Sequence, residues 1–371
     1  MEKVGYAIIG FGGIAENRIA KEGFGLDRTR FNGHPEAELI GVTDINQARK
    51  NAATALGLKW YASIEDVLKD PRIQGVFIAT NNLSHAPLAE QAIKAKRHCI
   101  LEKPFATTLG DAQKVQDLAR QNGMSITVDH MMMDNVYNIR ARDLVKQGVV
   151  GEVNDICLHM EFLYGSTPQE AATWRCADPD ELGGPIGDVA SHCLYMAEFL
   201  LDSPVDSLAC VYTPRTLDIS VENGAFIQFK LNNQIQGTVR VAFNQPRGSL
   251  ASTLTNLGYE TYGTKDIIRG YCTLFQLSGH VGESVDVRLE IDTCLLAPAS
   301  GRGTPAERRG LMGVETVKIK EVQNIYQAVI SMHARSIINK EPLDASEAIH
   351  NLRLILACHE SAKAGGKTIL C

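Results

Sequence analysis

The feature that most limits the folds open to this chain is a glycine-rich turn close to its first residues. The apolar run Val4–Gly10 leads into Gly-Phe-Gly-Gly-Ile-Ala at positions 10–15, a G-x-G-x-x-A pattern. In this pattern the first glycine permits a tight turn and the second lets the backbone approach a pyrophosphate. The small sixth residue lets the following helix pack on the sheet. A strand that ends in such a turn and opens a helix is typical of a dinucleotide-binding parallel sheet.

Four short apolar runs follow the first one, with stretches of helical periodicity between them. The five runs are Val4–Gly10, Glu38–Asp44, Gly75–Thr80, Cys99–Glu102 and Ser125–Val128. Their continuous apolar character indicates strands buried on both faces, as in a parallel sheet of βαβ units. The expected helices are Ile45–Leu56, Ile64–Lys69, Pro87–Ala95 and Leu109–Gln121. We therefore predict an α/β fold with an N-terminal Rossmann-type parallel sheet in residues 1–128, in which Lys21–Gly33 is an inserted loop.

After a helix at Asn138–Gln147, closed by Gly148, segments of alternating polar and apolar residues follow, which predicts a second domain of another kind. The alternating segments are Val153–Phe162, Val205–Tyr212, Gly224–Leu231, Gln234–Phe243 and Ser249–Leu257. Such alternation is typical of antiparallel strands with one solvated or interface face. The expected helices are Asn138–Gln147, Glu321–Asn339 and Ser346–Ala364. The segment Leu296–Gly313 is expected to be a mobile excursion, that is, a long loop between these elements. Residues 129–371 are thus predicted to form an α+β domain with a large, mostly antiparallel sheet, for substrate binding and oligomerisation.

Charge, hydropathy and cysteine spacing exclude several classes of protein. The 371 residues carry a net charge of −6, which argues against nucleic acid or an anionic membrane as the main partner. No apolar run reaches the roughly 20 residues that span a bilayer, and the N-terminus reads as a strand and not as a signal peptide. The 9 cysteines form no C-x-x-C pair, so neither a zinc knuckle nor a redox motif is expected. A reduced, cytoplasmic protein without a metal is predicted.

An acidic residue at the end of the second predicted strand indicates which dinucleotide is bound. Asp44 closes the run Val42-Thr43-Asp44. A carboxylate at this place hydrogen-bonds the 2′-hydroxyl of the adenosine ribose and repels a 2′-phosphate. NAD(H) is therefore expected over NADP(H), although Arg49 nearby keeps NADP(H) open. A glycine turn that binds no nucleotide is the structural alternative, and a helix-capping role for Asp44 is compatible with ribose binding.

Three further stretches resemble motifs of a known family. They are Ala79-Thr80-Asn81-Asn82-Leu83-Ser84-His85, Glu102-Lys103-Pro104 and Gly183-Gly184-Pro185-Ile186-Gly187-Asp188-Val189-Ala190-Ser191-His192. Together they make nearly the whole chain similar to the glucose–fructose oxidoreductase / inositol dehydrogenase / rhizopine-catabolism (Gfo/Idh/MocA) dehydrogenases. Asn81 replaces the usual proline of the first motif, and Pro185 and Ala190 replace glycines of the third. Tyr195 stands where the family often has an aspartate, which bears on substrate class more than on the reaction.

The resemblance extends the expected cofactor site beyond the glycine turn and Asp44. It adds the segment after the third strand and the Glu-Lys-Pro motif. The expected NAD contacts are Gly10, Phe11, Gly12, Gly13, Ile14, Asp44, Ile45, Ala79, Thr80, Asn81, Asn82, His85, Glu102 and Lys103.

Lys103, Asp188 and His192 have the properties that alcohol oxidation requires, namely a base for the hydroxyl proton and a cation for the developing alkoxide. Lys103 follows a buried strand and precedes a proline, so its ammonium is expected in the nucleotide crevice, with a cis Lys103–Pro104 bond allowed. Asp188 and His192 are four residues apart and share a helix face; His192 is the expected proton acceptor, and Asp188 is expected to orient the substrate or hold the charge balance. The resemblance implies the same catalytic set. The alternatives are a solvated lysine, a capping aspartate, a core histidine or half of a metal site.

Aromatic and basic residues ahead of the third motif are candidate substrate contacts. Trp174-Arg175 offers an indole face for a sugar or cyclitol ring and a guanidinium for its hydroxyls. Pairing of Arg175 with Asp178 or Asp180 is the alternative. His130, just after the fifth strand, is either a ligand contact or a core residue. The expected substrate-binding residues are Lys103, His130, Trp174, Arg175, Asp188 and His192.

These features predict an NAD(P)-dependent oxidoreductase that transfers a hydride between the nicotinamide and a secondary alcohol or ketone. The expected substrate is a sugar, a sugar derivative or a cyclitol. Two alternatives stay open: a non-catalytic sensor that binds dinucleotide and a sugar, and an enzyme that retains NAD and oxidises its substrate transiently. The resemblance implies that the antiparallel sheet pairs between subunits, so a homodimer or homotetramer is expected, with no nucleic-acid or membrane partner.

Overall fold

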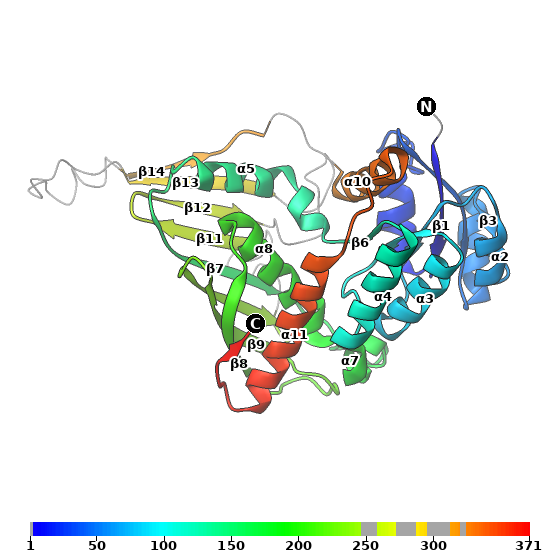
Figure 1. Cartoon of the computed structure of the whole chain (residues 1–371). Helices are drawn as coiled ribbons and strands as arrows, with labels where there is room; N and C mark the ends of the chain where they lie inside the picture. The colour runs from blue at the N-terminus through cyan, green and yellow to red at the C-terminus, as the bar shows by residue number, and fades with distance from the viewer. Residues whose placement is uncertain (1–2, 246–257, 272–286, 295–311, 320–323) are drawn as a thin grey trace, which may run out of the picture. The chain divides into compact units, whose positions relative to one another are not determined.

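The computed structural model describes residues 3–245, 258–271, 287–294, 312–319 and 324–371. The chain forms two compact units, each built around a sheet (Figure 1). The first unit comprises Met1–Met131, Asp180–Leu182 and Asn324–Arg353, and the second comprises Met132–Pro179, Gly183–Gln323 and Leu354–Cys371. The compact units take segments from both halves of the chain, so a domain boundary after residue 128 remains a prediction.

Six parallel strands form the sheet of the first unit, in the order β3-β2-β1-β4-β5-β6. Their bounds are β1 Val4–Ile9, β2 Ala37–Thr43, β3 Lys59–Trp60, β4 Gly75–Ile78, β5 His98–Leu101 and β6 Ile126–Val128. Every residue of β1, β4 and β6 is buried, as their continuous apolar character predicts. The chain order reverses at β1, which pairs with β2 on one side and β4 on the other. In such sheets ligands bind outside the carboxyl ends of the strands at the point of reversal.

The helices of the first unit follow the predicted alternation with two differences. They are the π-helix η1 Ala15–Gly23, the 3₁₀-helix η2 Gln47–Arg49, α1 Lys50–Ala55, α2 Ile64–Lys69, α3 Asn82–Lys94, α4 Leu109–Asn122 and α10 Ile325–Asn339. The predicted start of α3 at Pro87 is wrong, because the helix buries Asn82, His85 and Ala86 and this packing outweighs the one hydrogen bond that the proline cannot donate. The predicted loop Lys21–Gly33 is also shorter, since η1 continues to Gly23.

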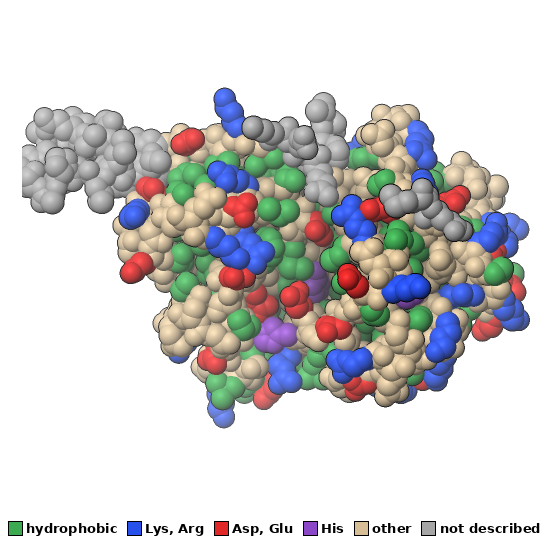
Figure 2. Space-filling view, turned by 45° about the horizontal axis from the view of Figure 1, so that its top comes forward, with side chains coloured by type: hydrophobic (Ala, Val, Ile, Leu, Met, Phe, Trp, Pro, Cys, Tyr) green, Lys and Arg blue, Asp and Glu red, His purple; other side chains and the backbone are tan. Residues whose placement is uncertain are grey.

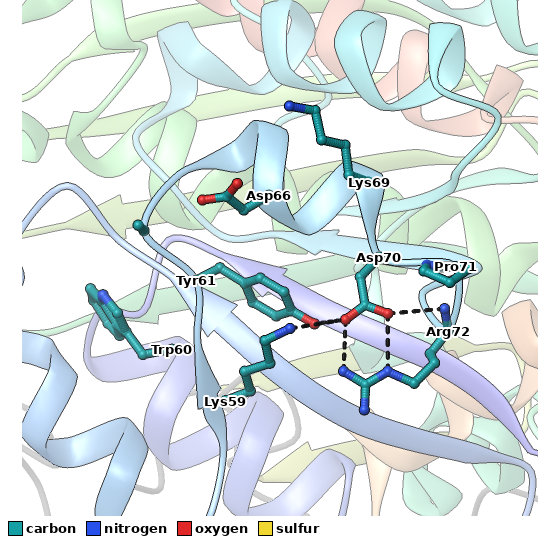
Figure 3. Close-up of a pocket in the computed structure, with 9 residues that line it drawn as sticks. Lys59, Trp60, Tyr61, Asp66, Lys69, Asp70, Pro71 and Arg72 are labelled. Atoms are coloured by element: carbon teal, nitrogen blue, oxygen red, sulfur yellow. Dashed lines mark hydrogen bonds and ion pairs between the residues drawn. The ribbon is translucent and has the colours of Figure 1, made fainter.

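The edge strand β3 is too short to show a periodicity, and polar bonds fix its position. The Asp70 carboxylate, just after α2, accepts hydrogen bonds from the Tyr61 hydroxyl at 2.7 Å, the Lys59 ammonium at 3.1 Å and the Arg72 guanidinium at 2.7 and 3.0 Å (Figure 3). The hydrogen bonds from Arg72, above all, hold the pKa of Asp70 well below its usual range. These side chains line a cavity of about 630 Å³. Because its central carboxylate is already paired with protein donors, we assign this cluster to the attachment of β3.

Nine strands form the sheet of the second unit, in the order β14-β13-β12-β11-β7-β10-β9-β8-β15. Their bounds are β7 Val153–Glu161, β8 Val205–Tyr212, β9 Gly224–Leu231, β10 Gln236–Ala242, β11 Gly258–Gly263, β12 Asp266–Tyr271, β13 Arg288–Cys294, β14 Met312–Thr316 and β15 Ile369–Leu370. Neighbouring strands are antiparallel except β7 and β10, which are parallel. The predicted fold class, with a parallel sheet and a large, mostly antiparallel one, is confirmed.

Some predicted segments of the second half lie outside the described residues. They are the strand at Ser249–Leu257, the first residues of the helix at Glu321–Asn339 and most of the excursion at Leu296–Gly313. Met312 and Gly313, at the end of that excursion, belong to β14.

The predicted helices Asn138–Gln147 and Ser346–Ala364 are observed, and further helices lie between them. The longer ones are α5 Val136–Lys146, α8 Ser191–Leu201 and α11 Ser346–Lys363, and the short ones are α6 Pro168–Ala171, α7 Trp174–Ala177 and the π-helix η5 Ile186–Ala190. The 3₁₀ turns η3 Met131–Asp134 and η4 Pro179–Glu181 lie where the chain passes from one unit to the other. Helix α8 contacts α5, β7 and β10, so it covers one face of the sheet near its centre. The first turns of α11, to Arg353, belong to the first unit.

The surface mixes charges of both signs. In the face shown in Figure 2, Lys and Arg side chains are interspersed with Asp and Glu over the described residues. Among the helices of the described ranges, none has both the length and the apolar character that a membrane crossing requires.

Candidate active site

The glycine turn at residues 10–13 leaves open space at the carboxyl end of β1. We call the space over Gly12 and Gly13 the cradle. Gly10 has a φ of +89°, and a Cβ there would lie 2.7 Å from both the Ala79 carbonyl oxygen and the Thr80 Cγ2, so only glycine fits. At Gly12 and Gly13, by contrast, no atom of the described residues, apart from the neighbouring residues of the turn and helix themselves, lies within 4 Å of the place that a Cβ would take. A pyrophosphate needs this combination of a tight turn, free space above the backbone and a following helix. The residues present therefore fit a dinucleotide.

Asp44 closes the cradle on the β2 side. One of its carboxylate oxygens accepts the Phe11 N–H at 2.5 Å, and the other accepts the Asn46 N–H at 2.7 Å. The acid at the end of β2 thus holds the glycine turn as well as the start of the next helix. Ile45, the next residue, is an apolar side chain that is completely exposed. A fully exposed isoleucine beside the cradle offers an apolar surface to a flat ring such as adenine.

Arg49 also lies at the glycine turn, but its charge is paired. Its Nε donates to the Phe11 carbonyl at 2.7 Å, its guanidinium lies 5.7 Å from the Phe11 ring, and it forms an ion pair with Glu16. Lys21 donates to the same Glu16 carboxylate at 2.7 Å. The hydrogen bond from Lys21, more than the one from Arg49, lowers the pKa of Glu16. The Glu16 carboxylate therefore pairs with both Lys21 and Arg49.

The segment after β4 is fixed by an acidic residue that sequence reasoning missed. Glu181, almost fully buried, forms hydrogen bonds with both asparagines of the motif: its carboxylate accepts from the Asn81 amide, and its carbonyl accepts from the Asn82 amide at 2.6 Å. The carboxylate also accepts the Leu83 N–H at 2.9 Å. Because Glu181 is 98 residues or more from its partners, no local pattern could have indicated it. The side-chain amides of both asparagines thus already donate hydrogen bonds to Glu181.

His85, Lys103 and His130 lie at the carboxyl end of the parallel sheet. His85 is fully buried and its Nδ1 lies 2.8 Å from the Pro104 carbonyl, to which it can donate. Lys103 follows β5, is 9% exposed, and forms the cis bond to Pro104 that the sequence allows. Burial, and secondly the charge of Lys103, lower the pKa of His130 to about 3. His130 is therefore neutral at physiological pH and close enough to Lys103 to sense its charge.

Asp188, Trp174 and Arg175 come together in the second unit. The Arg175 Nε lies 3.5 Å from an Asp188 carboxylate oxygen, and the guanidinium lies over the Trp174 ring at 4.4 Å. Arg175 is about one-third exposed, and Asp188 half as much. An indole face, a guanidinium and a carboxylate in one cluster can bind the apolar face and the hydroxyls of a sugar. The structure thus assembles three of the predicted substrate contacts.

His192 lies on the adjacent helix and is held by Tyr195. Its Nδ1 lies 2.7 Å from the Tyr195 hydroxyl, and the two rings meet edge to face with centroids 5.5 Å apart. Both side chains are buried, at 2% and 4% exposure. The π-helix η5, which carries Asp188, runs directly into α8, which carries His192.

Glu222 holds the glycine-rich turn that precedes these helices, and sequence reasoning missed it as well. Its carboxylate accepts the Ile186 N–H at 2.8 Å, and a Cβ on Gly184, which has a φ of +69°, would lie 2.6 Å from it. Burial raises the pKa of Glu222 to about 6. No motif surrounds Glu222 in the sequence, so only its place in the fold reveals it.

Among the described residues, no three His, Cys, Asp or Glu side chains are grouped so that they could hold a metal ion.

Comparisons with known proteins agree with these features. Residues 4–130 match the family model described as an oxidoreductase family with an NAD-binding Rossmann fold, and residues 139–269 match the GFO/IDH/MocA C-terminal domain. A 1,5-anhydro-D-fructose reductase from Ensifer adhaerens is 26% identical over 237 residues, which are 63% of this chain and 68% of the relative.

Solved structures share the fold over the whole chain. A levoglucosan dehydrogenase in complex with NADH and levoglucosan has a TM-score of 0.79 at 17% identity, covering 100% of this chain and 99% of the other. A 3-ketoreductase from Actinomadura kijaniata in complex with NADP and TDP-benzene has a TM-score of 0.78 at 16% identity, covering 97% and 98%. The neighbours thus carry either NADH or NADP.

We expect Glu222→Gln to stabilise the protein at high pH only. Because the pKa of Glu222 is raised, the wild type loses stability as the pH rises through about 6. Glutamine keeps the acceptor for the Ile186 N–H without the buried charge. From pH 5 to pH 8 the variant should gain about 1–2 kcal/mol over the wild type in urea unfolding. Exposed Glu360→Gln is the control, and a Glu222→Gln difference independent of pH would contradict the prediction.

Proposed function

The chain belongs to the GFO/IDH/MocA oxidoreductase family, and we propose that it transfers a hydride between NAD(H) and a secondary alcohol or ketone of a sugar, sugar derivative or cyclitol. The observation that carries the proposal is the open cradle over Gly12 and Gly13, bounded by Asp44, at the carboxyl end of β1. The relatives named above support the substrate class, because a reductase of 1,5-anhydro-D-fructose and a dehydrogenase of levoglucosan both act on sugar derivatives.

Three side chains are assigned to the chemistry. The bound nicotinamide supplies or accepts the hydride. The buried Lys103 ammonium donates a hydrogen bond to the reacting oxygen and stabilises the negative charge that develops there. His192 takes the hydroxyl proton in oxidation and returns it in reduction. Asp188 orients the substrate together with Arg175, while Trp174 packs against the sugar ring.

The proposal extends to the cofactor contacts. The backbone of the glycine turn binds the pyrophosphate, Asp44 the ribose hydroxyls and Ile45 the adenine. We assign the segment 79–82, Glu102 and Lys103 to the nicotinamide half of the cofactor. The buried His85 connects that segment to Pro104, so we assign it a supporting position.

The Glu16–Arg49 pair favours NAD(H) over NADP(H). A 2′-phosphate on the adenosine ribose needs a cation that is free to bind it. Arg49 is engaged by Glu16 and by the Phe11 carbonyl, and Asp44 adds a second negative charge at the same turn. Both carboxylates would repel a 2′-phosphate.

The outer face of the antiparallel sheet supports the proposed homodimer or homotetramer. Phe226 and Val211, on β9 and β8, are about half exposed, and a cavity of about 920 Å³ lies among β7, β8, β9 and β10. Apolar side chains on an open sheet face are expected to be covered by another subunit.

Lys103→Met should abolish turnover without abolishing cofactor binding. A panel of sugars, sugar acids and inositols, followed by NADH absorbance, identifies the best substrate for the wild type. On that substrate the variant should lose at least about 100-fold in kcat/KM, because a single donor to the reacting oxygen is worth that much. The NADH dissociation constant, measured by fluorescence, should change little.

Full activity of Lys103→Met would contradict its assigned role. In the wild type, NADH binding without any turnover would indicate a sensor, and turnover without net NADH release would indicate transient oxidation.

Glu16→Gln should admit NADPH. Releasing Arg49 and removing one negative charge should tighten the NADPH dissociation constant about 10-fold, while that of NADH stays within about 2-fold. Equilibrium fluorescence titration measures both constants without any substrate. Glu38→Gln, exposed on β2, is the matched control. Unchanged NADPH affinity would show that the pair does not exclude the phosphate, and a wild-type preference for NADPH would overturn the role of Asp44.

Light scattering after size-exclusion chromatography should give the mass of a dimer or tetramer. Phe226→Arg should shift this mass toward the monomer, because a charge then faces the buried interface. Ile338→Arg, at an exposed apolar position of α10, should leave the mass unchanged. A monomeric mass for the wild type would remove the proposed assembly.

A further inference from the structure

The bond between His192 and Tyr195 joins two buried side chains three residues apart on α8. Side chains on a helix tilt toward its N-terminus, so the longer tyrosine reaches back to the histidine one turn before it. The Nδ1–hydroxyl distance of 2.7 Å and the edge-to-face rings leave the imidazole one preferred orientation. Ring rotation would break this hydrogen bond between two buried side chains. Tyr195 therefore determines how the His192 ring is presented.

A hydrogen bond at Nδ1 also determines which nitrogen is available for chemistry. A neutral imidazole has one donor and one acceptor nitrogen, and the partner of one nitrogen sets the role of the other. When Nδ1–H donates to the Tyr195 oxygen, Nε2 carries the lone pair and can accept a proton. After Nε2 takes the proton, the imidazolium keeps the same Nδ1–H donor, so the bond survives the transfer.

The chemical nature of the partner matters because a hydroxyl carries no charge. A carboxylate in the place of Tyr195 would stabilise the imidazolium and make His192 a weaker acid. A neutral hydroxyl supports the orientation without that bias. Asp188, one turn earlier on η5, supplies a negative charge on the same helical segment.

We propose that Tyr195 is the positioning residue for His192: its neutral hydroxyl holds the imidazole through Nδ1, so that Nε2 exchanges the proton with the substrate oxygen. This inference rests on the proposed function. In alcohol oxidation the O–H bond breaks as the hydride leaves carbon for the cofactor, and the proton forms a bond to Nε2. In ketone reduction the same N–H bond breaks and the proton passes to the oxygen.

The first unit contains a matched pair that serves as a control. The Tyr6 hydroxyl lies 2.8 Å from Nδ1 of His333, both side chains are fully buried, and the rings are 5.8 Å apart. This pair joins β1 to α10 and has no part in the proposed chemistry. Tyr6→Phe therefore removes a comparable hydrogen bond at a comparable cost in stability.

The test compares Tyr195→Phe, Tyr195→Asp and Tyr6→Phe in the full chain. Tyr195→Phe should lower kcat about 10–100-fold with KM within about 3-fold, because proton transfer is impaired and substrate contacts remain. Without the acceptor for Nδ1–H, the limb of the kcat/KM profile that reports His192 should move to lower pH. In Tyr195→Asp the same limb should move to higher pH. A merely structural role would not give opposite shifts.

A second measurement does not depend on turnover. NMR titration of the chain labelled with ¹⁵N-histidine, assigned with His192→Gln, follows the His192 ring in the absence of substrate. Tyr195→Phe keeps the ring that fills the core, so it should fold even where Tyr195→Asp does not. Its His192 titration should shift to lower pH, while that of Tyr6→Phe should match the wild type.

An unshifted Tyr195→Phe profile and titration, or an equal shift in Tyr6→Phe, would overturn the role of Tyr195. The proposed function is tested separately by wild-type turnover. If no substrate is turned over, the function falls and this inference with it, whereas turnover with an unshifted profile overturns this inference alone.

Discussion

The close approach of two strand ends at Gly10 is the constraint on which the first unit depends. The backbone after β1 passes so near Ala79 and Thr80 that a single Cβ would collide with them, and the φ of +89° suits glycine alone. This turn directs the chain into η1 and brings the cradle beside the segment that follows β4. The placement of Asp44, Arg49 and Glu16 around the cradle follows from it.

Buried or half-buried carboxylates hold each of the three motif loops in the same way. Asp44 accepts the Phe11 N–H before η1, Glu181 accepts the Leu83 N–H in the first turn of α3, and Glu222 accepts the Ile186 N–H in the first turn of η5. Backbone N–H groups at the start of a helix have no partner within it, and the helix dipole favours a negative charge there. The loops proposed to face the cofactor and substrate are thus fixed by hydrogen bonds to carboxylates as well as by glycine geometry.

The sequence predicts what depends on local pattern and misses what depends on distant partners. Apolar runs located β1, β4 and β5 to within a residue or two, and the alternation located β8 and β9 at their observed bounds. The two residues of β3 are too few for any periodicity. Glu181 and Glu222 act on loops 98 and 36 residues away, a relation that no spacing rule encodes. Of the predicted site residues, Trp174, Arg175 and Asp188 are assembled by the fold, while the roles given to Lys103 and His192 remain proposals.

Helix α10 belongs to the first unit although it lies near the other end of the chain. It contacts β1, β2, β5 and η1, and its His333 and Ser336 bond to Tyr6 and Ser125 of that unit. The nucleotide-binding fold is therefore discontinuous in the gene. Recombination that exchanges it between relatives has to carry three separate stretches of coding sequence, because the N-terminal stretch by itself would lose Glu181 and expose the buried face that α10 covers.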